Sequence, residues 1–97
     1  PNPIRADRSF FPYVLEIQSA LLYQFVERVC VPLAIGNTVP GMTDRFNPHI
    51  VVNDTPCRLH PLGITVFLSS ELRRPVATAK PQALDIDTAL DMLLRGY

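Results

Sequence analysis

The side chains that could bind a metal ion or transfer a proton are few and scattered along this chain. Cys57 and His60 carry a thiol and an imidazole, two groups that bind zinc. On a predicted strand, however, residues three positions apart point to opposite faces, so this pair cannot hold one ion. We therefore interpret Cys57 as a core residue and His60 as a surface residue. His49 follows Pro48 at the start of another predicted strand, where we expect a hydrogen-bonded or solvent-facing imidazole rather than a general base.

Three aspartates, Asp85, Asp87 and Asp91, fall in the predicted C-terminal helix. Asp85 and Asp87 are near its N-terminal end, where the helix dipole stabilises a carboxylate, and Asp85 could also cap the helix. A catalytic carboxylate pair would need a cleft and a partner strand, and the sequence indicates neither. The four glycines occur singly, which excludes a phosphate-binding glycine loop, and the longest basic run is Arg73–Arg74. The sequence thus predicts no catalytic residue, no metal site and no cofactor.

The composition is that of one small domain, residues 1–97, with a formal net charge of zero. This neutrality disfavours direct nucleic-acid binding, and no apolar run is long enough for a membrane span. The absence of an export signal and the presence of only two cysteines, Cys30 and Cys57, favour reduced thiols in the cytoplasm. Because the chain begins with Pro1, we expect further residues upstream.

Short alternating or β-branched runs predict strands that are separated by prolines and turns. Residues 12–18 alternate, with Tyr13, Leu15 and Ile17 on one face. The other predicted strands are 28–34, 49–53, 57–61 and 75–79, with a turn at 54–56. Residues 63–70 fit either a strand or an irregular crossing. The loop 35–46 is long, and we expect it to be functional or mobile.

Two segments have helical spacing. Ser19 is predicted to cap a short helix that runs on to Arg28. The second helix begins after Pro81 and carries one apolar stripe, formed by Ile86, Ala89, Leu90 and Leu93. Several short strands followed by a terminal helix predict a mainly β (α+β) domain, in which a small antiparallel barrel or curled sheet packs against that helix.

The order of these segments resembles one known family. The stretches that carry the resemblance are "YVLEIQSALL", "RVCVPLA", "RFNPHIVVND", "LHPLGITVFLSSELRRPVATA" and "DIDTALDMLLRGY". They resemble the CcdB family of toxins from bacterial toxin–antitoxin modules, most clearly at Gln18-Ser19, Val31-Pro32-Leu33, Asn47-Pro48 and the helix that ends at Gly96. Relatives begin with one more strand, which is missing here or lies upstream of residue 1.

The resemblance implies a small SH3-like curled antiparallel β-barrel with a C-terminal α-helix, and a symmetric homodimer. It also implies a cytoplasmic protein that is not an enzyme: it binds the A subunit of DNA gyrase, traps the cleaved DNA complex, and is neutralised by the disordered tail of a cognate antitoxin. In such a dimer the two terminal helices lie side by side, so we expect Ile86, Leu90 and Leu93 to form the interface.

The last three residues, Arg95, Gly96 and Tyr97, are the expected gyrase contact. The best-known relatives end in Trp-Gly-Ile, so Gly96 alone carries over. Arg95 in place of tryptophan predicts weak poisoning of a standard gyrase, or adaptation to a gyrase with a different surface. Alternatively, Gly96 only terminates the helix in a left-handed conformation. Two other functions stay open: a non-toxic relative that only binds a protein partner, and an RNA-cleaving toxin on the same barrel.

Overall fold

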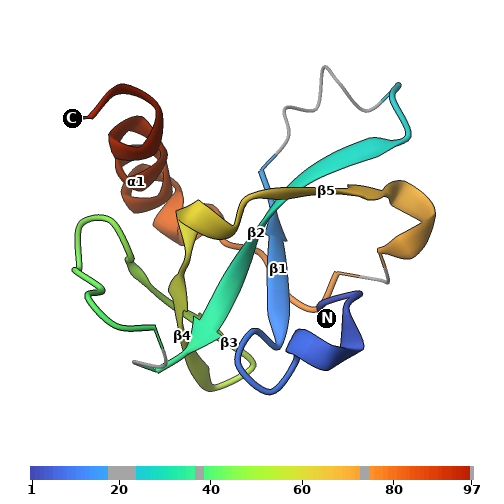
Figure 1. The fold of residues 1–97 in the computed structure, drawn as a ribbon, viewed down its shortest axis with the longest axis horizontal. Helices are drawn as coiled ribbons and strands as arrows, with labels where there is room; N and C mark the ends of the chain where they lie inside the picture. Colours follow the sequence, from blue (N-terminus) through green and yellow to red (C-terminus); the bar gives the residue numbers. More distant parts are fainter. Residues whose placement is uncertain (18–23, 37–38, 73–74, 97) are drawn as a thin grey trace.

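The computed structural model describes residues 1–17, 24–36, 39–72 and 75–96, which form one curled antiparallel sheet and one α-helix (Figure 1). The regular elements are β1 (Tyr13–Glu16), β2 (Glu27–Ile35), β3 (His49–Val52), β4 (Thr55–Leu59), β5 (Thr65–Leu68) and α1 (Ala83–Arg95). Short 3-10 turns occur at η1 (Arg5–Asp7), η3 (Pro61–Gly63), η4 (Ser69–Glu71) and η5 (Lys80–Gln82). This is the α+β architecture that the sequence predicts.

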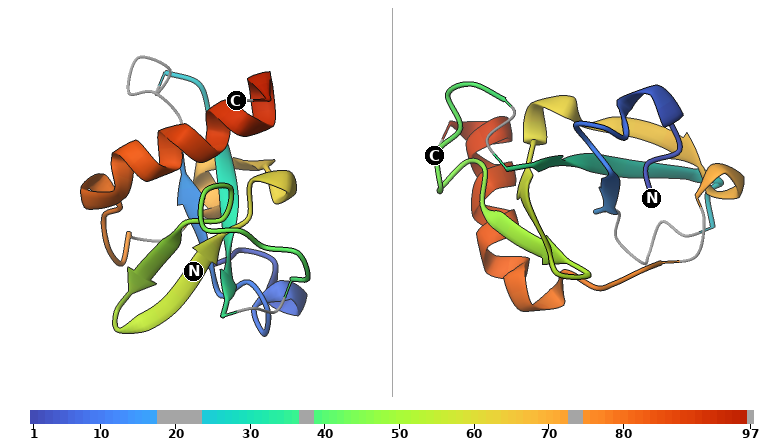
Figure 2. Two further views of the ribbon diagram at one scale, coloured as in Figure 1. Left: turned by 90° about the vertical axis from the view of Figure 1, so that its left-hand side faces the viewer. Right: turned by 90° about the horizontal axis from the view of Figure 1, so that it is seen from below.

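The long strand β2 organises the sheet. One of its edges pairs with β1, and its other edge pairs first with β5 and then, farther along, with β4. The path through the sheet is β1-β2-β4-β3, so β1 and β3 are its outer strands. Because β4 and β5 share one edge of β2, the sheet bends around that strand. Figure 2 shows α1 at one end of the sheet and η1 at the opposite end.

The core lies between this sheet and α1. Alternation along β2 directs Val31 and Leu33 to the core face, where both are almost fully buried. The helix contributes Ile86 and Ala89 to the same cluster. The remaining buried members come from the β3–β4 hairpin and are Ile50, Val52, Cys57 and Leu59. The predicted face of the first strand is confirmed, since Tyr13, Leu15 and Ile17 pack against this cluster.

The hairpin turn differs from the prediction. Asn53 and Asp54 form a two-residue turn with φ of 46° and 66°, and β4 resumes at Thr55. The predicted turn at 54–56 is therefore wrong. Asparagine and aspartate tolerate positive φ better than other residues with a side chain, and two positive φ angles suit the twist of a tight hairpin. Pro56 lies within β4, opposite Val51.

Two predicted elements need correction. The helix expected from Ser19 to Arg28 begins in residues outside the described part of the chain, but residues 24–26 form turns and bends, and Glu27 already starts β2. Pairing of Glu27 and Arg28 with β5 overrides the local helical spacing. The strand expected at 75–79 belongs to none of the five strands. Its composition suits a strand, but no described strand pairs with it.

The terminal helix is confirmed, with two details. Gln82 is its N-cap and no side chain caps it, so the expected cap by Asp85 is wrong, although Asp85 does lie in the first turn. At the other end Gly96 has φ of 80°, and its N–H donates to the carbonyl of Met92 at 3.1 Å. A left-handed C-cap of this kind favours glycine, which lacks a Cβ. Gly96 thus terminates the helix, as the alternative interpretation expected.

Candidate partner-binding surfaces

The residues with metal-binding or redox potential are separated by the fold. Cys57 is in the core, whereas His60 lies beyond the end of β4 and stacks on Phe11, with ring centroids 5.5 Å apart. Both Cys30 and Cys57 are free and buried, so the predicted reduced state is confirmed. Burial, and secondarily the charge of Glu16, raises the pKa of Cys30 to about 11, and burial also raises the pKa of Cys57. Neither thiol is activated as a nucleophile.

The described residues contain no group of three or more His, Cys, Asp or Glu side chains that could hold a metal ion. In the same part of the chain, every helix is too short or too polar to cross a membrane.

One cleft of about 290 Å³ opens between β1, β3 and residues 75–79. Its walls are mainly apolar, and Glu16 is the only charged side chain that lines it. The Glu16 carboxylate is 3.6 Å from Nε of Arg28, so an ion pair already engages it. A cleft with one paired carboxylate and no second acid or base offers no constellation for general acid–base catalysis.

The C-terminal end of α1 projects from the core. Leu94 is 74% exposed, and Arg95 and Gly96 are exposed as well. Nη1 of Arg95 contacts Oδ1 of Asp91 at 2.5 Å, one helical turn back. The carboxylate compensates the arginine charge within the same helix, which sequence analysis did not consider although the i,i+4 spacing is a direct signal. Tyr97 lies outside the described residues.

The predicted stripe on α1 is divided between the core and the surface. Ile86 is 7% exposed and belongs to the chain's own core, and Leu90 is partly buried against it. Leu93 is half-buried. The large apolar side chains of α1 that are clearly exposed are Leu84 and Leu94, near its two ends.

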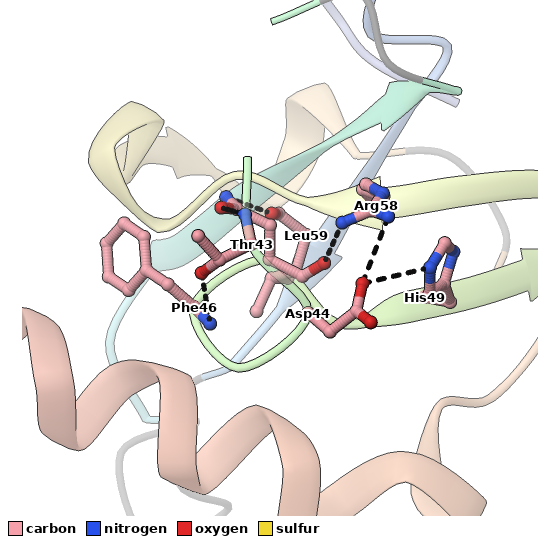
Figure 3. Close-up of polar contacts among 7 residues, drawn as sticks. Thr43, Asp44, Phe46, His49, Arg58 and Leu59 are labelled. Carbon is pink, nitrogen blue, oxygen red and sulfur yellow. Dashed lines mark hydrogen bonds and ion pairs between the residues drawn. The ribbon is translucent and has the colours of Figure 1, made fainter. Parts of the chain in front are cut away.

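A polar cluster that sequence analysis missed joins the loop before β3 to the β3–β4 hairpin (Figure 3). We call Asp44, His49 and Arg58 the Asp44 cluster. Oδ1 of Asp44 lies 3.1 Å from Nη2 of Arg58 and 3.4 Å from Nε2 of His49. His49 and Arg58 are directly opposite each other in the β3–β4 ladder. His49 is solvent-facing, as expected, with 62% of its side chain exposed.

The loop carrying Asp44 has its own anchor, the buried side chain of Asn47. Its Oδ1 accepts a hydrogen bond from the N–H of Thr43 at 3.1 Å, and its Nδ2 donates to the carbonyl of Leu59 at 2.9 Å. The N–H of Leu59 donates in turn to the carbonyl of Pro48. Because proline has no N–H, Pro48 cannot return a bond to Leu59, and the Asn47 amide supplies that donor instead.

Comparison with known proteins agrees with this architecture. The family model described as CcdB protein matches residues 1–96, which is nearly the whole chain. A comparison with curated proteins found no match. The family match and the curled sheet with its terminal helix point the same way, and they agree with the resemblance carried by the order of the sequence segments. This chain therefore belongs to the CcdB family.

Proposed function

We propose that this protein is the toxin of a bacterial type II toxin–antitoxin module and that it acts in the cytoplasm by binding the A subunit of DNA gyrase and trapping the cleaved DNA complex. The observation that carries the proposal is the family match over residues 1–96. The lack of a catalytic constellation among the described residues is compatible with a toxin that acts by binding rather than as an enzyme.

In this proposal the gyrase contact is the end of α1 with the residues that follow it: Arg95, Gly96 and Tyr97. Arg95 and Gly96 are exposed, and Leu94 beside them offers a large apolar side chain. Because Asp91 pairs with Arg95, docking this end buries a neutralised pair rather than a lone cation, which lowers the desolvation cost. Apolar side chains and arginine are frequent anchors of protein interfaces.

The proposed protein is a homodimer with α1 at its interface. Ile86 supports the helix from within the core, while Leu90 and Leu93 retain surface that a second copy can cover. Leu93→Glu should therefore shift the protein to a monomer in multi-angle light scattering. Leu84→Glu is the matched control, because Leu84 is also on α1 but lies in its first turn. A dimer that persists in Leu93→Glu would place the interface elsewhere.

A cognate antitoxin is the second proposed partner. Its disordered tail would fold onto the toxin, so its affinity would depend on a few anchor side chains that offset the cost of ordering.

Induced expression in bacteria tests the proposed toxicity. We expect loss of viability that a truncation lacking Gly96 and Tyr97 relieves. Incubation of the purified protein with single-stranded RNA distinguishes the RNA-cleaving alternative, which would leave cut RNA. Full survival with normal expression would instead identify a non-toxic relative, an outcome to which the departure at Arg95 gives weight.

A further inference from the structure

Arg58 is well buried but incompletely hydrogen-bonded. Its side chain is 13% exposed, Nη1 donates to the carbonyl of Asn47 at 3.4 Å, and Nη2 faces Asp44. Its Nε is buried and has no hydrogen-bond partner in the described structure. A buried N–H without a partner costs free energy, and a guanidinium is best satisfied by two parallel bonds to one carboxylate. The Nε and Nη2 groups form one side of the guanidinium, and only Nη2 is engaged.

Asp44 is a poor permanent partner for this arginine. Its side chain is 83% exposed, and a single oxygen, Oδ1, serves both Arg58 and His49. Water and salt weaken an ion pair with so exposed a partner. A carboxylate that approached Arg58 side-on could bond Nη2 and Nε together, which Asp44 does not do.

Displacement of Asp44 leaves the loop anchored. The bonds from Asn47 to Thr43 and Leu59 do not involve Asp44, and neither does the bond between the N–H of Asn47 and the carbonyl of Thr43 at 2.7 Å. Only the exposed ion pairs are lost when the Asp44 side chain swings outward. The surface that remains is cationic, since the exposed Arg45 is next in the chain.

We propose that the Asp44 cluster is a carboxylate-exchange site, in which an acidic side chain of an extended protein segment displaces Asp44 and binds Arg58 through Nη2 and Nε. Asp44 then acts as an internal competitor that keeps the site closed until the partner arrives. The identity of the partner rests on the proposed function, which makes the disordered antitoxin tail the natural source of the acidic segment. The charge of Arg45 and Arg58 supports an acidic partner.

The test is a titration of isotope-labelled protein with blocked tetraglutamate, with blocked tetraglutamine as the neutral control and free glutarate as the small-molecule control. The Nε–H resonance of Arg58 is followed by NMR. We expect it to shift with tetraglutamate only, and we expect Asp44→Asn to tighten binding about two- to fivefold by removing the competitor. Arg58→Lys keeps the charge but loses the fork, so its binding should fall to the level of tetraglutamine.

Arg5→Gln is the matched control for net charge, because Arg5 lies on η1 and takes no part in the cluster. It should bind tetraglutamate as the parent does. Equal affinity in the parent and Asp44→Asn, or full affinity in Arg58→Lys, would overturn the proposal. Glutarate that binds as tightly as tetraglutamate would overturn the protein segment as the ligand. No gyrase is present in the titration, so its failure is distinguishable from failure of the proposed toxicity.

Discussion

Asn47→Ala should destabilise the protein by about 2–4 kcal/mol, which is large for one side chain that makes two hydrogen bonds. The side chain of Asn47 is 4% exposed, so water does not replace it readily. Its loss leaves the carbonyl of the fully buried Leu59 without a donor, at about 1–3 kcal/mol. The bond to the N–H of Thr43, a more exposed residue, adds roughly 0.5–1.5 kcal/mol.

A second substitution tests the reason for this loss. If Asn47 replaces the donor that Pro48 lacks, then Asn47→Ala/Pro48→Ala restores an N–H facing Leu59 and should recover a substantial part of the stability. The free energy of unfolding is measured by urea denaturation, with the m-value checked for constancy. A cost below about 1 kcal/mol for Asn47→Ala, or a double variant less stable than the single one, would refute the reasoning.

Three further changes probe the rest of the fold. Gly63→Ala should cost about 1–3 kcal/mol in urea denaturation, because an added Cβ would lie 2.6 Å from Cγ of Pro32; an unchanged unfolding midpoint would contradict this. Cys30 and Cys57 should resist Ellman's reagent at pH 8 until urea unfolds the protein, and rapid labelling of the native state would show that the thiols are accessible. Burial lowers the pKa of His60, so the unfolded chain takes up its proton first; stability should fall below about pH 6.5, and less so in His60→Gln. Stability that rises on acidification over this range would oppose that sign.

The sequence patterns that could be trusted are those that pairing and burial reinforce. The alternation of Val31 and Leu33 and the helical stripe through Ile86 and Ala89 both report the same buried cluster, so β2 and α1 were predictable. Residues 75–79 have the composition of a strand, but a strand requires a partner edge, which local composition does not reveal. The tight turn at Asn53 and Asp54 carried a readable signal, the tolerance of both residues for positive φ.

The candidate surfaces were less predictable. With the two-residue turn assigned, the ladder register alone places His49 opposite Arg58. The approach of Asp44 depends on how the preceding loop is folded by Asn47, and no periodicity encodes that contact. The pair between Asp91 and Arg95, in contrast, follows from helical spacing alone.

Gyrase-mediated DNA cleavage tests the central claim most directly. Supercoiled plasmid is incubated with ATP, the protein and gyrase from the same organism, and covalent complexes are released with detergent and protease. The proposal predicts linear DNA that increases with the protein concentration, and much less of it with a truncation lacking Gly96 and Tyr97. Arg95→Trp should change the potency, since it alters the proposed contact. No linear DNA at any concentration of a correctly folded protein would contradict the proposed function, and undiminished cleavage with the truncation would contradict the proposed contact at the end of α1.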